Sequence, residues 1–302
     1  MSYAQGSVID AADYNGLVGS NSTTAGTINY VWNTGNGQFG YGQGAVSAVS
    51  AAATITATQW STMLNALNRS LQHQAGAAAS LGPLNYTAGS VITHFANVAT
   101  AVTTINTNKL DFNSTRGATT TGADFDATFA TTTFTRTITV TFASADQARY
   151  FFNAGGRLSL VFSPSGLTDN AKETSYNDLM NAIGTLHLDQ LTSTRTGTGE
   201  TTTTNGLAIG YWDLTTSNQT ILKLTSDNAT YTGNTLEVFM RVAGAAGSNG
   251  GLGTQVIYDI TYTDGADEAF NDAISGTFRH RVDIVKPEVT YLTDVWGTIT
   301  IS

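Results

Sequence analysis

The clearest alternation of apolar and polar positions lies in residues 134–163. Threonines fill most positions of one parity at the start of this stretch, and the apolar residues of the other parity are Phe134, Ile138, Val140 and Phe142. A second alternating run follows at Leu158, Leu160 and Phe162. A period of two is typical of a strand with one buried face, so both runs are predicted to be strands.

The residues between these two strands predict a short helix. Ser144 and Gln147 have the spacing of a capping box, in which two side chains satisfy free amide groups at a helix N-terminus. Phe151 and Phe152 follow on one side of the helix, and Gly155 supplies the positive φ at which many helices end. The stretch therefore predicts strand, helix and strand in succession.

The first hundred residues contain a degenerate repeat that predicts helix starts. Its copies, the last of them weaker, begin at residues 7, 53 and 90. The repeat places Asp10 three residues before Asp13, and Thr56 three residues before Gln59, which is again the spacing of a capping box. The second copy predicts the longest helix of this region, with apolar residues at spacings of three and four: Trp60, Met63, Leu64, Leu67 and Leu71.

Aromatic side chains in this region have two possible roles. The glycine-rich residues 30–44 predict a loop, and loops that display aromatic side chains are often contact sites. In the alternative interpretation, the aromatic side chains fill the space between short helices. The candidate contacts with neighbouring subunits are Tyr14, Trp32, Tyr41 and Trp60.

The polar segment at residues 106–127 predicts a domain boundary, because it is rich in threonine and glycine. The predicted parts are an N-terminal helical docking region at 1–110, a linker at 111–127 and a β-rich domain at 128–302. The last of these contains a predicted helix at 174–183, which Gly184 ends. The further strand-like runs are residues 186–188, 207–214, 220–224, 236–242, 255–262, 276–285 and 296–301.

Residues 192–206, which are polar and lack apolar anchors, predict a loop, and residues 247–253 predict another. Pro287 predicts that the strand before it lies at a sheet edge, where a missing amide hydrogen is tolerated. The predicted fold class is α+β and predominantly β. A small N-terminal helical region precedes an antiparallel β-sandwich-like domain with short helices.

Composition narrows the classes of function. The chain has 302 residues, of which only 12% are charged, and a formal net charge of -9. The acidic balance disfavours a nucleic-acid partner, because binding phosphates requires clustered Lys and Arg. No cysteine is present, so disulfides and thiolate metal sites are excluded. The N-terminal residues lack the pattern of a signal peptide, and no apolar run has the length of a membrane helix, so cytoplasmic synthesis without membrane insertion is expected.

No strong catalytic or ligand-binding motif occurs. The four histidines lie on separate predicted elements without metal-ligand spacing: His73, His94, His187 and His280. Arg279 and Arg281 are expected on one face of a strand, with His280 on the other, and either an exposed sheet edge or an ion pair with Asp283 explains the arrangement. The acidic residues around 264–272 lack the spacing of a calcium-binding loop and are expected to form a solvated turn. We therefore expect no metal, no cofactor and no enzymatic activity.

Several segments together resemble a known family. They are residues 54–74, 140–160, 210–224 and the terminal WGTITIS, and RYFFNAGG at 149–156 is the most specific piece. These segments resemble virion structural proteins of tailed bacteriophages, of the contractile-tailed type found in phages of cyanobacteria and other marine hosts. The resemblance implies a non-catalytic component of the particle.

The expected function is therefore assembly within a virion, as part of the tail, baseplate, neck or fibre. The implied partners are other virion proteins and further copies of the chain, and the implied location is the virion after synthesis in the host cytoplasm. In this hypothesis the N-terminal region docks to the particle and the β-rich domain projects or bridges. The alternative is a fibre or capsid decoration module whose loops at 192–206 and 244–253 bind host-surface glycans. Its candidate patch is residues 211–213, where strand alternation would bury either Trp212 or the neighbouring Tyr211 and Asp213.

Overall fold

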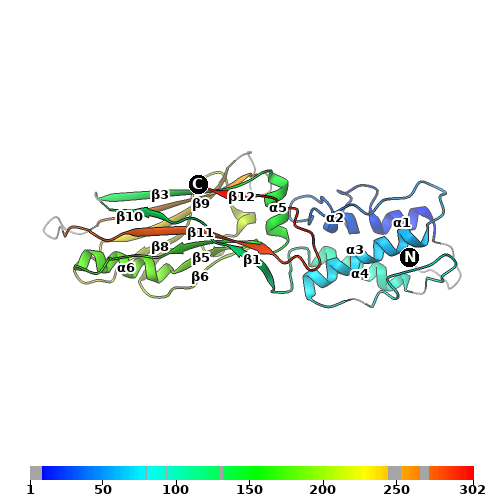
Figure 1. The fold of residues 1–302 in the computed structure, drawn as a ribbon, viewed down its shortest axis with the longest axis horizontal. Helices are drawn as coiled ribbons and strands as arrows, with labels where there is room; N and C mark the ends of the chain where they lie inside the picture. The colour runs from blue at the N-terminus through cyan, green and yellow to red at the C-terminus, as the bar shows by residue number, and fades with distance from the viewer. Residues whose placement is uncertain (1–8, 79, 93, 130–131, 244–252, 266–271) are drawn as a thin grey trace. The chain divides into compact units, whose positions relative to one another are not determined.

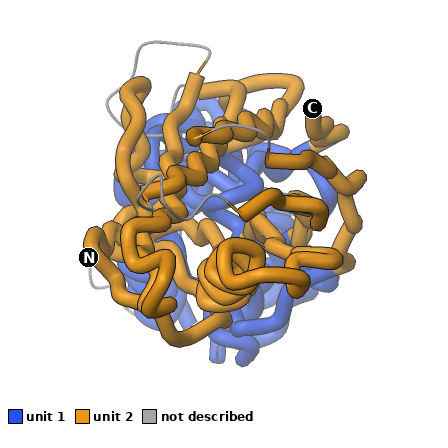
Figure 2. The backbone as a smooth tube through the Cα atoms, turned by 90° about the vertical axis from the view of Figure 1, so that its left-hand side faces the viewer, with its two compact units in different colours: residues 1–117, 149–155, 287–296 blue, residues 118–148, 156–286, 297–302 orange. Residues whose placement is uncertain are grey.

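The chain divides into two compact units. The computed structural model describes residues 9–78, 80–92, 94–129, 132–243, 253–265 and 272–302. Unit 1 contains residues 1–117, 149–155 and 287–296, and unit 2 contains residues 118–148, 156–286 and 297–302 (Figure 2). Each unit is therefore assembled from segments that are distant in sequence.

The N-terminal segment of unit 1 is helical. Its helices are α1 (Ala11–Val18), α2 (Ile28–Trp32), α3 (Ala57–Ala75) and α4 (Phe95–Thr107) (Figure 1). The Asp10 carboxylate accepts a hydrogen bond from the amide of Asp13 at 2.9 Å and caps α1. At α3, the Gln59 amide donates to the Thr56 hydroxyl (3.2 Å), and the Thr56 amide donates to the Gln59 side chain (2.9 Å). Both predicted helix starts are confirmed.

Unit 2 is dominated by two sheets. The first has the strand order β1-β11-β4-β5-β6, with β2 also paired to β11. Its strands are β1 (Arg116–Thr120), β2 (Phe125–Ala127), β4 (Arg157–Phe162), β5 (Thr185–Leu188), β6 (Ser193–Arg195) and β11 (Phe278–Pro287). The second has the order β12-β3-β10-β9-β8-β7. Its strands are β3 (Thr133–Phe142), β7 (Thr201–Asn205), β8 (Gln219–Thr225), β9 (Thr235–Ala243), β10 (Gln255–Thr263) and β12 (Ile299–Ile301).

The two sheets pack face to face through aromatic side chains. On β10, Tyr262 lies 4.8 Å from Phe278 of β11, measured between ring centroids. Phe134 of β3 lies 6.2 Å from the same ring. Within the second sheet, β10 pairs antiparallel with β3 and β9, and Val256 is opposite both Val140 and Val242. The fold is α+β, predominantly β and sandwich-like, as the sequence predicts.

The stretch with the clearest alternation forms the predicted strand, helix and strand. β3 and β4 flank α5 (Ala145–Asn153). The Gln147 amide donates to the Ser144 hydroxyl at 3.1 Å, which is one half of the predicted capping box. Gly155 has a φ of 86°, in the left-handed region. The second predicted helix is α6 (Ala171–Ile183), and it is followed by Gly184.

Several predictions from local pattern were wrong. The predicted linker contains β1 and β2, and the predicted loop at 192–206 contains β6 and β7. These strands are short or lie at sheet edges, where backbone pairing requires no alternating apolar face. Pro287 ends β11, which lies between β1 and β4 and not at an edge. Pro287 lies beyond Val285, the last β11 residue paired with β4, so its missing amide hydrogen interrupts no bond to β4.

The predicted strand at 207–214 is instead a turn with a 3₁₀ segment at Tyr211–Asp213. A side chain on Gly210 would lie 2.2 Å from the backbone carbonyl carbon of Leu191, so the two chain segments can approach only at a glycine. The Tyr211 amide then donates to the carbonyl of Asp189 at 2.9 Å. Tertiary contacts thus override the local strand pattern. Most of the predicted loop at 244–253 lies outside the described residues.

Candidate docking surface

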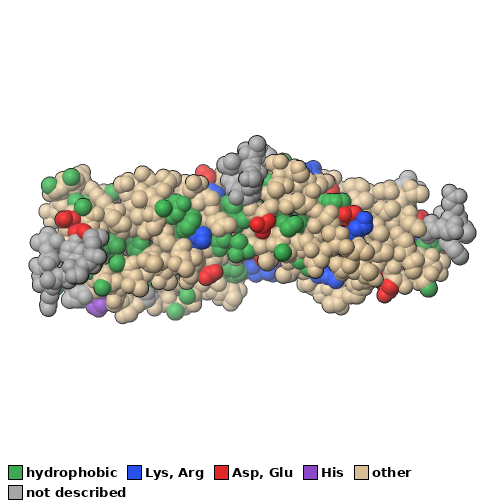
Figure 3. Space-filling model, turned by 180° about the vertical axis from the view of Figure 1, so that it is seen from behind, with side chains coloured by type: hydrophobic (Ala, Val, Ile, Leu, Met, Phe, Trp, Pro, Cys, Tyr) green, Lys and Arg blue, Asp and Glu red, His purple; other side chains and the backbone are tan. Residues whose placement is uncertain are grey.

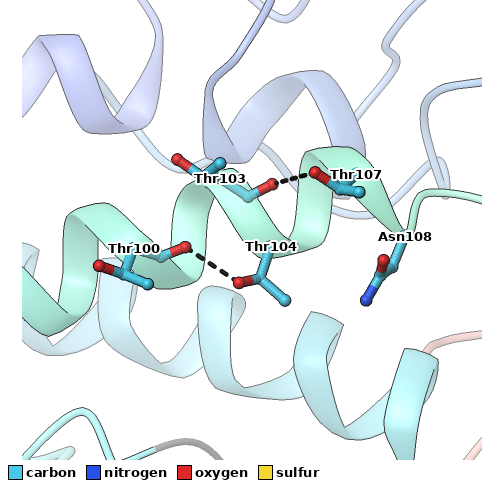
Figure 4. Close-up of a pocket in the computed structure, with 5 residues that line it drawn as sticks. All are labelled: Thr100, Thr103, Thr104, Thr107 and Asn108. Carbon is cyan, nitrogen blue, oxygen red and sulfur yellow. Dashed lines mark hydrogen bonds between the residues drawn. The ribbon is translucent and has the colours of Figure 1, made fainter.

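A shallow groove of about 360 Å³ follows the exposed side of α4 (Figure 4). The residues that line it are uncharged: Thr100, Thr103, Thr104, Thr107 and Asn108. The opposite side of α4 packs into unit 1 through Val98, Val102 and Ile105. From Phe95 to Thr107 the helix contains no Asp, Glu, Lys or Arg. An amphipathic helix normally carries charged residues on its solvent side, so the absence of charge on this face of α4 is unusual.

The threonine hydroxyls of this face are satisfied within the helix. Each donates to the carbonyl of the residue four positions earlier, at distances of 3.0 to 3.2 Å: Thr100 to Ala96, Thr103 to Ala99, Thr104 to Thr100 and Thr107 to Thr103. Figure 4 shows two of these bonds as dashed lines. The hydroxyl hydrogens therefore have no need of water or a partner, and the methyl groups remain available for contact.

An aromatic pair lies close to the C-terminal end of α4. The rings of Tyr30 and Phe39 stack with their centroids 4.2 Å apart, and both side chains are half-buried. The ammonium of Lys109 lies 5.0 Å from the centre of the Phe39 ring, within the range of a cation–π interaction. Lys109 directly follows Asn108 of the groove. We call the groove residues together with Tyr30, Phe39 and Lys109 the α4 docking surface.

Side chains of α5 hold the glycine-rich segment that carries Phe39. The Arg149 guanidinium donates to the carbonyls of Phe39 (2.6 Å) and Thr34 (2.8 Å). The Asn153 amide donates to the carbonyl of Gly40 at 3.1 Å. Arg149 and Asn153 are buried, at 4% and 0% exposure. These two residues belong to the RYFFNAGG segment, so its polar positions fix the loop that presents Phe39.

The four aromatic residues proposed as contacts lie in the core of unit 1. Their side chains are at most 6% exposed: Tyr14, Trp32, Tyr41 and Trp60. The Tyr41 hydroxyl donates to the carbonyl of Lys109 at 3.0 Å, and the Trp32 indole donates to the carbonyl of Gly44 at 2.9 Å. Of the two roles considered for these side chains, the structure shows the filling of space between helices. Tyr30 and Phe39, in contrast, are half-buried and reach the surface.

The threonines of α4 were missed because threonine is common throughout this chain. A signal was nevertheless present in the sequence. The apolar spacing at 95–105 predicts a helix, and the absence of any charge in the same segment indicates a face suited to burial against another protein.

The histidines do not come together. His280 is buried, its ring nitrogen Nε2 lies 2.7 Å from the Tyr262 hydroxyl, and burial, assisted by the charge of Arg136, lowers its pKa to about 3. Burial also lowers the pKa of His73 to about 4. Both are thus neutral at pH 7. Among the described residues, no group of three or more His, Cys, Asp or Glu side chains is arranged to hold a metal ion.

The flanking arginines of His280 are placed as predicted, on the opposite face of β11. Arg281 forms an ion pair with Asp283 at 2.8 Å, and Arg279 pairs with Asp126 at 2.7 Å. Because these side chains are partly exposed, solvent screens both ion pairs and they contribute little to stability. The arrangement is that of a charged strand face and has no catalytic geometry.

One serine and one histidine do lie within hydrogen-bond distance. The Ser159 hydroxyl is 2.9 Å from Nδ1 of His187 on the neighbouring strand. Asp283 on β11 is opposite Ser159 on β4, and Ser159 is opposite His187 on β5. The three residues thus form a row across the sheet in which the serine lies between the acid and the histidine. A catalytic triad needs the histidine between the serine and the acid, so this row has a different order. Its evident effect is to link β4 to β5.

The candidate glycan patch is largely buried. Tyr211 and Trp212 are 0% and 3% exposed, so the expected choice between them was wrong and both rings belong to the core.

At the acidic segment, Asp264 pairs with Lys172 at 2.6 Å, and Asp272 accepts a hydrogen bond from Tyr231 at 2.7 Å. The acidic residues between them lie outside the described part of the chain.

Comparison with known proteins gives no assignment: no protein-family model, curated protein or solved structure matches this chain. Within the described residues, no helix combines the length and apolar character needed to cross a membrane.

Proposed function

We propose that this chain is a non-enzymatic structural subunit of a tailed bacteriophage particle and acts by protein–protein assembly. The observation that carries the proposal is the α4 docking surface, whose groove residues are uncharged and whose threonine hydroxyl donors are already satisfied. The resemblance of the 149–156 segment and its neighbours to virion proteins supplies the kind of particle. The place within the particle is the tail, baseplate, neck or fibre.

The physics of the α4 docking surface favours association. Burying a charge without a partner is costly, and the core of a protein interface is accordingly depleted in charged residues. When the threonine methyl groups of α4 are buried, no hydroxyl donor is left without an acceptor, because each donor already has an acceptor in the helix. Tyr30 and Phe39 add aromatic surface of the kind that dominates interface energetics.

The rest of the surface is consistent with a subunit whose neighbours are proteins. Figure 3 shows one face of the molecule, on which acidic and basic side chains are few and scattered. Several of the charged side chains of unit 2 are paired with one another, as in Lys223 with Glu237 at 3.1 Å. Other virion proteins and further copies of the chain are the partners we propose, with unit 1 docking through α4.

The proposal is tested by locating the protein on intact particles. Particles purified from a host lysate are labelled with an antibody against the full chain and viewed by electron microscopy. Label at a defined place on the tail, baseplate, neck or fibre is expected. Label on the capsid would favour a decoration role, and particles that carry none of the protein would contradict the proposal.

A further inference from the structure

Lys172 and Asp264 form a buried ion pair in unit 2. The Lys172 ammonium lies 2.6 Å from the carboxylate of Asp264, and the two side chains are only 6% and 13% exposed. Lys172 is in the first turn of α6, and Asp264 directly follows the last residue of β10. The pair thus joins a helix to the end of a strand that is distant in sequence.

Aromatic rings surround the pair. The ammonium lies 6.0 Å from the centre of the Phe129 ring. Tyr176, one turn further along α6, is 0% exposed, and its hydroxyl has no hydrogen-bond partner within the described residues. Burial raises the pKa of Tyr176, and the nearby charge of Asp264 raises it further. Removing two ions from water into such surroundings carries a large desolvation cost, and a neutral amide would avoid it.

The backbone on both sides of the pair is fixed by hydrogen bonds. The Asn170 side chain caps α6 by accepting from the Glu173 amide at 2.9 Å. The Glu173 carboxylate in turn accepts from the amide of Gly276 at 3.0 Å. On the other side, the Asp264 amide donates to the carbonyl of Thr132 at 2.8 Å. Two reacting groups held this close and in a fixed orientation react as if at very high concentration.

We propose that Lys172 and Asp264 condense to an isopeptide bond in the folded protein. One proton passes from the ammonium to the carboxylate, and the resulting amine attacks the carboxyl carbon. A bond forms between Nζ and Cγ, and the bond between Cγ and one carboxyl oxygen breaks. That oxygen leaves as water with two of the three ammonium protons, and the third stays on the amide nitrogen. The step is a condensation without redox change, so it needs no co-reactant.

The cross-link has a clear physical consequence. The chain has no cysteine, so disulfides cannot restrain it. An amide between Lys172 and Asp264 would close the intervening chain into a loop and lower the entropy of the unfolded state. This inference concerns unit 2 alone and does not depend on the proposed function.

The test is the intact mass of the full-length protein, measured under denaturing conditions after native purification. We expect a mass lower than that of the sequence by one water molecule. Proteolysis and fragment sequencing are expected to recover the peptides that contain Lys172 and Asp264 as one joined species. A folded protein with the full mass of its sequence would overturn the proposal.

A matched variant separates this reaction from a different loss of water. Asp264 precedes Gly265, and the carboxyl group of an aspartate can also cyclise onto the amide nitrogen that follows it. Lys172→Arg keeps the positive charge but removes the amine, so its mass is expected to be that of its own sequence. Loss of water that persists in Lys172→Arg, or fragments that place it within residues 264–265, would overturn the proposal. The half-exposed pair Lys223 and Glu237 serves as an internal control and is expected to stay uncoupled.

Discussion

The guanidinium of Arg149 donates a hydrogen bond of 2.6 Å to the carbonyl oxygen of Phe39. The same guanidinium reaches the carbonyl of Thr34, so one side chain on α5 holds both ends of a glycine-rich loop. The Phe39 ring on this loop stacks against Tyr30. A buried side chain therefore determines where an aromatic side chain of the docking surface lies.

Replacing Arg149 by Met is expected to destabilise unit 1. The change keeps much of the apolar stem but leaves buried carbonyl groups without their charged donor, at an expected cost of about 2 to 4 kcal/mol. The measurement is urea unfolding of the full chain. Arg195→Met is the control, because Arg195 is half-exposed and its loss should cost less than about 1 kcal/mol. Equal losses for the two variants would contradict the role given to Arg149.

Charges placed on the neutral face of α4 are expected to block assembly without unfolding the protein. Thr100 and Thr103 are both exposed, and Glu is a better helix former than Thr, so the double change to Glu should alter stability by less than about 0.5 kcal/mol. Recovery on particles, in competition with the unmodified chain, is expected to fall about tenfold or more, which corresponds to about 1.4 kcal/mol.

The control for this prediction is Thr62→Glu on α3. Thr62 is also exposed, and its hydroxyl likewise donates to the carbonyl four residues earlier, at 2.9 Å, but it lies outside the α4 docking surface. Its recovery on particles should match that of the unmodified chain. If the double variant on α4 were incorporated equally well, the docking role of this face would be excluded.

Stability is expected to fall as the pH decreases from about 6.5 toward 5. Burial lowers the pKa of His73 to about 4 and that of His280 to about 3, whereas both groups titrate near 6.5 in the unfolded chain. Below pH 6.5 the unfolded state therefore binds protons that the folded state does not. Each histidine lowers the free energy of unfolding by up to about 1.4 kcal/mol per pH unit in this window.

Urea unfolding at pH 7, 6 and 5 measures this effect. Above pH 7 both histidines are neutral in both states and the slope should vanish. His280→Gln removes one titrating group, so its stability should decrease less steeply than that of the unmodified chain. A stability that stays constant between pH 7 and pH 5 would contradict the buried, neutral state of the two rings.

Glu173 is expected to be among the costliest carboxylates to replace. Its carboxylate accepts hydrogen bonds from the amides of Asp169 (2.8 Å) and Gly276 (3.0 Å) and from the Ser275 hydroxyl (2.9 Å). Burial acts to raise the pKa of Glu173, but the hydrogen bonds from Ser275, Asp169 and Gly276 outweigh it and lower the pKa. Glu173→Gln turns one acceptor into a donor and should cost about 2 to 4 kcal/mol in urea unfolding.

Glu237→Gln provides the comparison for Glu173→Gln. Glu237 lies on the polar face of β9 in a partly exposed pair with Lys223, so its replacement should cost less than about 1 kcal/mol. A loss as large as that of Glu173→Gln would mean that burial and hydrogen bonding do not distinguish the two sites.

The strand, helix and strand around α5 and the capped starts of α1 and α3 could be predicted because they depend on neighbours in sequence. A capping side chain such as Thr56 bonds an amide three residues away, and alternation on β3 reports one buried face. The sandwich class also followed from these patterns. The candidate site was less predictable, since only the uncharged run of α4 was visible in the sequence.

Only the tertiary structure decided the features that depend on partners distant in sequence. Strands β1, β2 and β7 exist because a neighbouring strand supplies their hydrogen bonds, so their own polar residues gave no signal. Trp212 and Tyr211 are both buried because Gly210 lets two chain segments approach, which a strand period could not reveal. The sequence by itself determined where α1 and α3 start and which strand faces are apolar, through bonds and periods of a few residues. Packing decided which aromatic side chains reach the surface, because that depends on what covers each face.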